Sequence, residues 1–161
     1  MPGSEIALIA LLLAALGALT VIDARTYRLP DILTLPLIAA GIGAAFILDE
    51  TIWLHALGAV IGYLVLVAVE KAYERTRGRP GLGRGDAKLF AAGGAWCGAL
   101  ALPFILLAGS LSALIYVGVM RLVTGKTMGG DHMIAFGPFL AFAIALIFIL
   151  KRLGLTAPLG L

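Results

Sequence analysis

The chain has 161 residues, of which 61% are hydrophobic and only 13% are charged. Soluble domains contain about 25% charged residues, so the composition excludes an ordinary soluble globular protein. The net charge of +3 does not predict nucleic-acid binding here, because Lys and Arg in such an apolar chain more often mark membrane topology. The single cysteine, Cys97, excludes a disulfide framework and the usual zinc patterns.

Six apolar runs predict six transmembrane helices in one all-α, multi-pass domain that covers residues 1–161 and is surrounded by lipid. The expected spans cover residues 5–22, 32–48, 52–69, 87–98, 104–119 and 133–150. The fourth is short for a membrane that requires about 20 residues. The first run contains Glu5 and lacks the basic start of a signal peptide, so we expect it to be retained.

The basic residues predict which loops face the cytoplasm. Ten of the 12 Lys and Arg side chains follow the first, third and fifth spans. They are Arg25, Arg28, Lys71, Arg75, Arg77, Arg79, Arg84, Lys88, Arg121 and Lys126. The positive-inside rule therefore predicts cytoplasmic loops after these spans and two non-cytoplasmic termini.

Two aspartates are predicted at the cytoplasmic ends of spans. Asp23 ends the first span, and Asp86 begins the fourth. Ionisable groups at the edge of hydrocarbon are costly and are functional candidates. Structural alternatives exist for both: Asp86 can cap its helix, and Asp23 can pair with Arg25 or Arg28.

Four neighbouring residues are candidates for substrate binding or for support of these carboxylates. Gly83 and Gly85 precede Asp86, and we expect them to leave room for an extended peptide and to allow positive φ angles. Lys88 either holds the charge of Asp86, contacts substrate or snorkels to the interface. Asp31 follows Pro30 and is expected in the first turn of a helix.

Two carboxylates in contact have a recognised hydrolytic chemistry. One ionised Asp takes a proton from water while the protonated partner polarises the carbonyl that is cleaved. From helix dipoles alone, Asp86 at a helix N-terminus would hold the charge and Asp23 at a C-terminus would hold the proton. The sequence offers no metal-ligand spacing, so neither a metal nor another cofactor is expected.

Three segments together resemble the type IV prepilin leader peptidases, which are membrane aspartyl proteases with a Gly-X-Gly-Asp motif. The first runs from Ile22 to Leu37, and the second is Gly83-Arg-Gly-Asp-Ala-Lys-Leu89 with the following Gly94-Ala-Trp-Cys-Gly98. The third is Ala135-Phe-Gly-Pro-Phe-Leu140, which is similar to the family's Pro-Phe-Gly-Pro segment. They occur in the family's order along nearly the whole chain.

The resemblance implies a peptidase of the inner membrane with its active site facing the cytoplasm. It implies that Asp23 and Asp86 are the catalytic pair. The implied partner is a prepilin or pseudopilin with a short basic leader and an apolar helix. The chain has no CxxC motif, so the N-methyltransferase activity of larger members is not expected, and the oligomeric state is left open.

Two other classes of function are compatible with a small polytopic chain. A proton- or cation-coupled transporter would use the aspartates as binding groups, but its sites usually lie near the middle of the membrane. A non-catalytic subunit of a pilus or secretion platform would use them only as helix caps. We expect Asp131 and His132 at the cytoplasmic face, where they either line the cleft or are solvated or hydrogen-bonded loop residues.

Overall fold

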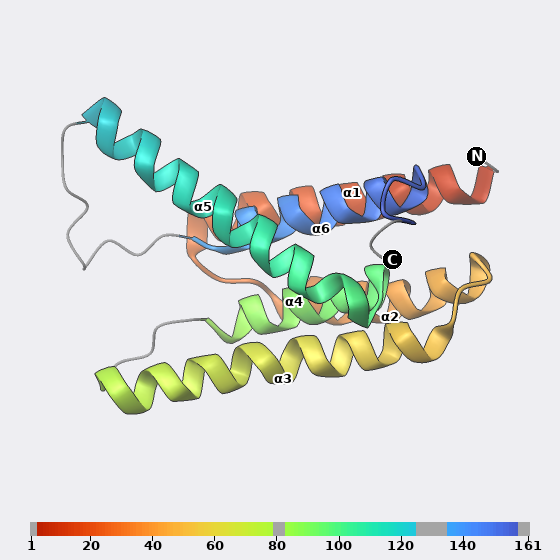
Figure 1. Ribbon diagram of the computed structural model, residues 1–161, viewed down its shortest axis with the longest axis horizontal. Helices are drawn as coiled ribbons and strands as arrows, with labels where there is room; N and C mark the ends of the chain where they lie inside the picture. Colours follow the sequence, from red (N-terminus) through yellow and green to blue (C-terminus); the bar gives the residue numbers. More distant parts are fainter. Residues whose placement is uncertain (1–2, 79–82, 125–134, 158–161) are drawn as a thin grey trace.

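A computed structural model describes residues 3–78, 83–124 and 135–157, and this part of the chain is all-α (Figure 1). Its helices are α1 (Gly3–Thr26), α2 (Asp31–Ile47), α3 (Ile52–Arg77), α4 (Arg84–Cys97), the 3-10 turn η1 (Ala99–Ala101), α5 (Leu102–Thr124) and α6 (Gly137–Arg152). Each expected span corresponds to one α-helix. The predicted all-α class is therefore confirmed.

Three of the described helices are long and apolar enough to cross a membrane: α1, α3, and α5 together with η1. The other three are shorter, with 17 residues in α2, 14 in α4 and 16 in α6. A span requires about 20 residues at ordinary membrane thickness, so α4 is too short to cross alone. The N-terminal end of α1 and the C-terminal end of α6 lie at the same end of the bundle (Figure 1).

Helix α4 lies inside the bundle and packs against α2, α3 and α6. Ten of its 14 residues are buried, which its small side chains allow. A Cβ on Gly94 would lie 2.2 Å from the carbonyl oxygen of Gly58 on α3, so these two backbones are in direct contact. The Trp96 indole N–H donates to the Leu37 carbonyl of α2 at 2.9 Å. Helix α4 is therefore held to α3 by a close backbone contact and to α2 by the Trp96 side chain.

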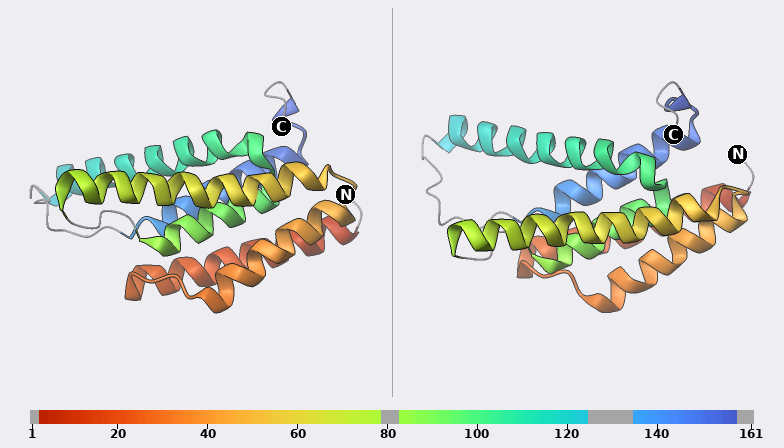
Figure 2. Two further views of the ribbon diagram at one scale, coloured as in Figure 1. Left: turned by 90° about the horizontal axis from the view of Figure 1, so that it is seen from below. Right: turned by 60° about the horizontal axis from the view of Figure 1, so that its bottom comes forward.

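Helix α3 is longer than the sequence predicted. Residues 70–86 were expected to form one charged loop, whereas α3 continues to Arg77. The segment from Glu70 to Arg77 is rich in Glu, Lys, Ala and Arg, which favour helix even where no apolar face is buried. Gly78 ends the helix with a left-handed φ of 68°. Both α3 and α5 extend beyond the first turns of α4 and α6 (Figures 1 and 2).

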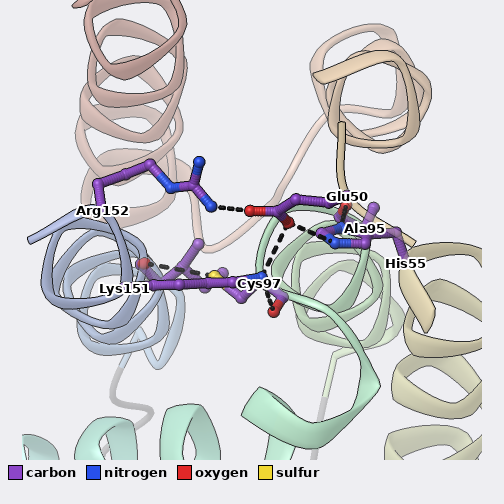
Figure 3. Close-up of polar contacts among 7 residues, drawn as sticks. Glu50, His55, Ala95, Cys97, Lys151 and Arg152 are labelled. Atoms are coloured by element: carbon purple, nitrogen blue, oxygen red, sulfur yellow. Dashed lines mark hydrogen bonds and ion pairs between the residues drawn. The ribbon is translucent and has the colours of Figure 1, made fainter. Parts of the chain in front are cut away.

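A cluster of ionisable side chains joins the helices near the C-terminal ends of α2 and α6 (Figure 3). Glu50 lies between α2 and α3, and its carboxylate contacts His55 Nε2 at 2.7 Å and Lys151 Nζ at 2.9 Å. Arg152 also pairs with Glu50. We call Glu50, His55, Lys151 and Arg152 the far-end ion cluster.

The far-end ion cluster gathers around the C-terminal ends of helices. Lys151 Nζ donates to the Cys97 carbonyl at 3.2 Å, and His55 Nδ1 contacts the Ala95 carbonyl at 2.8 Å. Both carbonyls belong to the last turn of α4, where four carbonyl groups lack helical partners. Cations here also offset the negative ends of α4 and α6. His55 is therefore a buried link between α3 and α4.

Candidate active site

Asp23 is a buried carboxylate in the last turn of α1. Its side chain is only 5% exposed, and its Oδ2 accepts a hydrogen bond of 3.1 Å from the Gly137 amide, the first residue of α6. In the described part of the chain neither Arg25 nor Arg28 forms an ion pair with it; both are exposed. The ion-pair alternative is not observed, and the negative group lies instead against the positive end of another helix.

Asp86 is the third residue of α4, and Gly83 occupies the N-cap position. The Asp86 side chain is therefore not the N-cap of α4, and the alternative role of Asp86 as a helix cap is not observed. Asp86 precedes the apolar part of α4, outside the helices that are long enough to span a membrane. Its pKa is raised to about 7, chiefly by burial and then by the negative charge of Asp23, while a hydrogen bond from the Gly83 amide acts in the opposite direction.

This pKa direction corrects the assignment made from helix dipoles. The dipole of α4 alone favours an ionised Asp86, but burial and the negative charge of Asp23 are larger influences and favour the proton. The influence of Asp23 also indicates that the two carboxylates lie within electrostatic reach of each other. The C-terminal end of α1 and the N-terminal end of α4 lie at the same end of the bundle (Figure 1).

Gly85 brings the start of α4 against the turn that follows Asp23. A Cβ on Gly85 would lie 2.8 Å from Leu29 Cβ, which is closer than real side chains pack. A Cβ on Gly83 would have only ordinary contacts, the nearest at 3.7 Å to Asp86 Oδ2. Neither glycine has a positive φ, so that part of the prediction was wrong. Gly85 is required by close packing against Leu29.

Lys88 pairs with Asp31, with 2.5 Å between Nζ and Oδ1. Asp31 is the first residue of α2, as expected, and its side chain is 59% exposed, against 23% for Lys88. The pair joins the N-terminal parts of α2 and α4. Lys88 was considered as a partner for the charge of Asp86. The observed ion pair is with Asp31 instead.

Gly137 is the residue that the sequence analysis missed. Its segment was noted only as a motif, although a Gly-Pro pair at the start of an apolar run is a signal for a helix start with close backbone approach. Asp131 and His132 lie outside the described residues. Within the described residues, no three His, Cys, Asp or Glu side chains are grouped as metal ligands.

The candidate site therefore contains two interacting carboxylates and a backbone donor. Asp23 is held by the amide of Gly137, and Asp86 has a proton available near neutral pH. Two carboxylates that share one proton form a combined base and acid. Such a pair can supply both the base and the acid for water-dependent cleavage of an amide.

Comparison with known proteins identifies the family. The model of the type IV leader peptidase family matches residues 10–118, which include both aspartates. The chain is 41% identical over 140 residues to the prepilin leader peptidase/N-methyltransferase of Dickeya chrysanthemi, covering 85% of this chain and 48% of that protein. It is 47% identical over 127 residues to the protein of the same name from Escherichia coli (strain K12), covering 76% and 54%.

The similarity to a third relative has the same extent. The prepilin leader peptidase/N-methyltransferase of Neisseria gonorrhoeae is 42% identical over 141 residues, covering 86% of this chain and 46% of that protein. The chain thus spans about half the length of each of these three relatives. No solved structure matches significantly. Because the family model covers more than half of the sequence, the chain belongs to the type IV leader peptidase family.

Proposed function

We propose that this chain is a membrane aspartyl endopeptidase that removes the short leader from type IV prepilins or prepilin-like proteins. Asp23 and Asp86 form its catalytic pair, and the reaction uses a water molecule without a metal or another cofactor. The observation that carries this proposal is that the last turn of α1, which contains Asp23, and the start of α4, which contains Asp86, lie at the same end of the bundle (Figure 1), within the segment that matches the family.

The chemistry follows from a pair that shares one proton. The ionised carboxylate removes a proton from water, and the resulting hydroxide attacks the carbonyl carbon of the peptide bond that is cleaved. The protonated carboxyl donates a hydrogen bond to the carbonyl oxygen and stabilises the charge that develops there. The tetrahedral intermediate collapses when the leaving amine receives a proton from the pair. Both carboxyls then return to their initial combined charge.

The substrate class rests on family membership and on the names of the relatives, which are prepilin leader peptidases. A prepilin presents a basic leader before an apolar helix that remains in the membrane. Such a substrate delivers its cleavage site to the membrane interface. The ends of α1 and α4 that carry the aspartates also belong to the basic, cytoplasmic side in our topology. We therefore propose an inner-membrane enzyme that cleaves at the cytoplasmic face.

The direct test is cleavage of a purified prepilin by the purified protein in detergent. Asp23→Asn and Asp86→Asn retain size and polarity but cannot exchange a proton, so we expect each to lower kcat at least about 100-fold. Asp49→Asn is the matched control, because Asp49 is exposed and lies beyond the opposite end of α2. A chelator should leave the activity unchanged. Retention of activity by either Asn variant would exclude the catalytic pair.

A further inference from the structure

The first turn of α6 has one main-chain donor that no backbone carbonyl accepts in the described structure. The amides of Phe139 and Leu140 both donate to the Phe136 carbonyl, at 3.1 Å each, and Pro138 has no N–H. The amide of Gly137 donates instead to Oδ2 of Asp23 at 3.1 Å. The carboxylate therefore satisfies the donor that the start of α6 leaves open.

Position 137 has no space for a side chain. A Cβ there would lie 2.5 Å from Asp23 Oδ2 and 3.0 Å from its Cγ. Any larger residue must therefore displace either the carboxylate or the start of α6. Glycine is required here by the close approach of Asp23.

This contact favours the ionised form of Asp23. A backbone N–H donates to a carboxylate more strongly than to a neutral acid oxygen, and the N-terminal end of α6 adds a favourable dipole. The contact also makes the two carboxylate oxygens of Asp23 different. Oδ2 accepts a hydrogen bond from Gly137, whereas no hydrogen bond to Oδ1 occurs in the described part of the chain.

The charged groups nearest the pair do not reverse this preference. Asp86 on α4 is a titratable group that interacts electrostatically with Asp23. The cations on the first turns of α4 are directed elsewhere, since Lys88 pairs with Asp31 on α2 and Arg84 lies 3.8 Å from Glu70 on α3. Asp86 holds a proton to about pH 7, which is consistent with Asp23 as the ionised partner.

We propose that Gly137 is a positioning residue that holds Asp23 ionised through Oδ2, so that Oδ1 of Asp23 is the general base toward water and Asp86 is the general acid. This assignment rests on the proposed peptidase function. It adds the first turn of α6 to the catalytic apparatus and gives the two aspartates different roles.

The test compares three glycine-to-alanine variants in the prepilin cleavage assay. Gly137→Ala pushes on Asp23, whereas Gly93→Ala creates a similar overlap, 2.9 Å to Ile144 Cγ1, away from the carboxylates. Gly109→Ala makes only ordinary contacts of 3.6 Å with α6. We expect Gly137→Ala to lower kcat about 100-fold with little change in KM, and to move the acid limb of the pH profile to higher pH.

Gly93→Ala should lower thermal stability without moving the acid limb, and Gly109→Ala should change neither. If Gly137→Ala lowers kcat but leaves the acid limb in place, the contact between Gly137 and Asp23 serves only packing and the proposal is overturned. If the wild-type protein cleaves no prepilin, the proposed function fails instead, which is a separate result.

A spectroscopic measurement covers the case in which Gly137→Ala does not fold. The infrared difference spectrum between the wild-type protein and Asp86→Asn, at about pH 6, reports whether Asp86 is protonated or ionised in the wild-type protein. We expect the variant to lose a protonated carboxyl band. Loss of a carboxylate band would assign the proton to Asp23 and overturn the proposal.

Discussion

Gly85 and Leu29 lie in direct contact, so close that a Cβ on Gly85 would approach Leu29 Cβ to 2.8 Å. Leu29 is buried and belongs to the turn between α1 and α2, six residues after Asp23, while Gly85 immediately precedes Asp86. The contact therefore links the two aspartate-bearing segments through main chain and one side chain. Position 85 therefore requires glycine because of this close packing, and not because of an unusual backbone angle.

Replacement of Gly85 by Ala should displace the start of α4 or Leu29. We expect a loss of about 1–3 kcal/mol of unfolding free energy from overpacking, and a fall in kcat of about tenfold or more because Asp86 moves with the helix. Thermal unfolding in detergent and cleavage kinetics measure the two effects. Gly83→Ala is the matched comparison, since its Cβ has space.

The pair of glycine variants also separates packing from substrate contact. If Gly83 lies under the bound peptide, Gly83→Ala should raise KM while leaving stability nearly unchanged. A Gly85→Ala protein with wild-type stability and kcat would contradict the packing argument.

Lys88 should contribute little to catalysis, because its ammonium is paired with Asp31. The pair is partly exposed, so a double-mutant cycle with Lys88→Met and Asp31→Asn should give a coupling of at most about 1 kcal/mol in unfolding free energy. The kcat of Lys88→Met should fall by no more than about fivefold. A much larger loss of activity in Lys88→Met than in Asp31→Asn would instead indicate that Lys88 contacts substrate or Asp86.

Glu50 should be a major determinant of stability. Its carboxylate is the common partner of three basic side chains in the far-end ion cluster (Figure 3). Glu50→Gln leaves these groups largely buried without their counter-charge, so we expect a loss of about 3 kcal/mol. Thermal unfolding of the purified protein measures it.

The neighbouring Asp49 provides the control for Glu50. Asp49 is exposed and has a φ of 55°, a conformation that Asn also tolerates, so Asp49→Asn should change stability by less than about 0.5 kcal/mol. Equal destabilisation by both variants would mean that the turn, and not the ion cluster, stabilises this end.

The fold class and both candidate aspartates were predictable from local sequence, because apolar runs and short motifs are local signals. Asp23 and Asp86 each stand at the junction of a polar segment and an apolar run. The extent of α3 was not predictable from hydropathy, since Glu70 to Arg77 continues the helix on propensity alone. The partners of Lys88, Gly85 and Gly137 were not predictable either, because each depends on how two helices distant in sequence pack together.

Dipole reasoning about the protonation states failed for the same reason. It treated α4 by itself, whereas burial within the bundle and the charge of Asp23 control Asp86. The hydrogen bond from Gly137 to Asp23 comes from a helix 114 residues away in sequence. A carboxylate at a helix terminus responds to every element around it, so its titration requires the tertiary structure.

The raised pKa of Asp86 predicts how stability depends on pH. Its value is about 7 in the folded protein, against 3.8 for an ordinary Asp. Between these two values the folded state binds more protons than the unfolded state, so this group favours folding at low pH and loses that contribution as the pH rises through about 7. Asp86→Asn should therefore flatten the decrease in unfolding free energy over this interval, as measured by chemical unfolding at a series of pH values.

Removal of the charge at position 23 should shift the same titration. Asp23→Asn retains the burial of Asp86 but eliminates the negative neighbour, so the pKa of Asp86 should fall below about 7. Carboxyl-selective NMR of labelled aspartate, or infrared titration, follows Asp86 directly in this variant. Asp49→Asn should leave the titration in place, since Asp49 adjoins the far-end ion cluster. A titration of Asp86 that is identical in Asp23→Asn and the wild-type protein would mean that the two carboxyls do not interact, and the shared-proton mechanism would then fail.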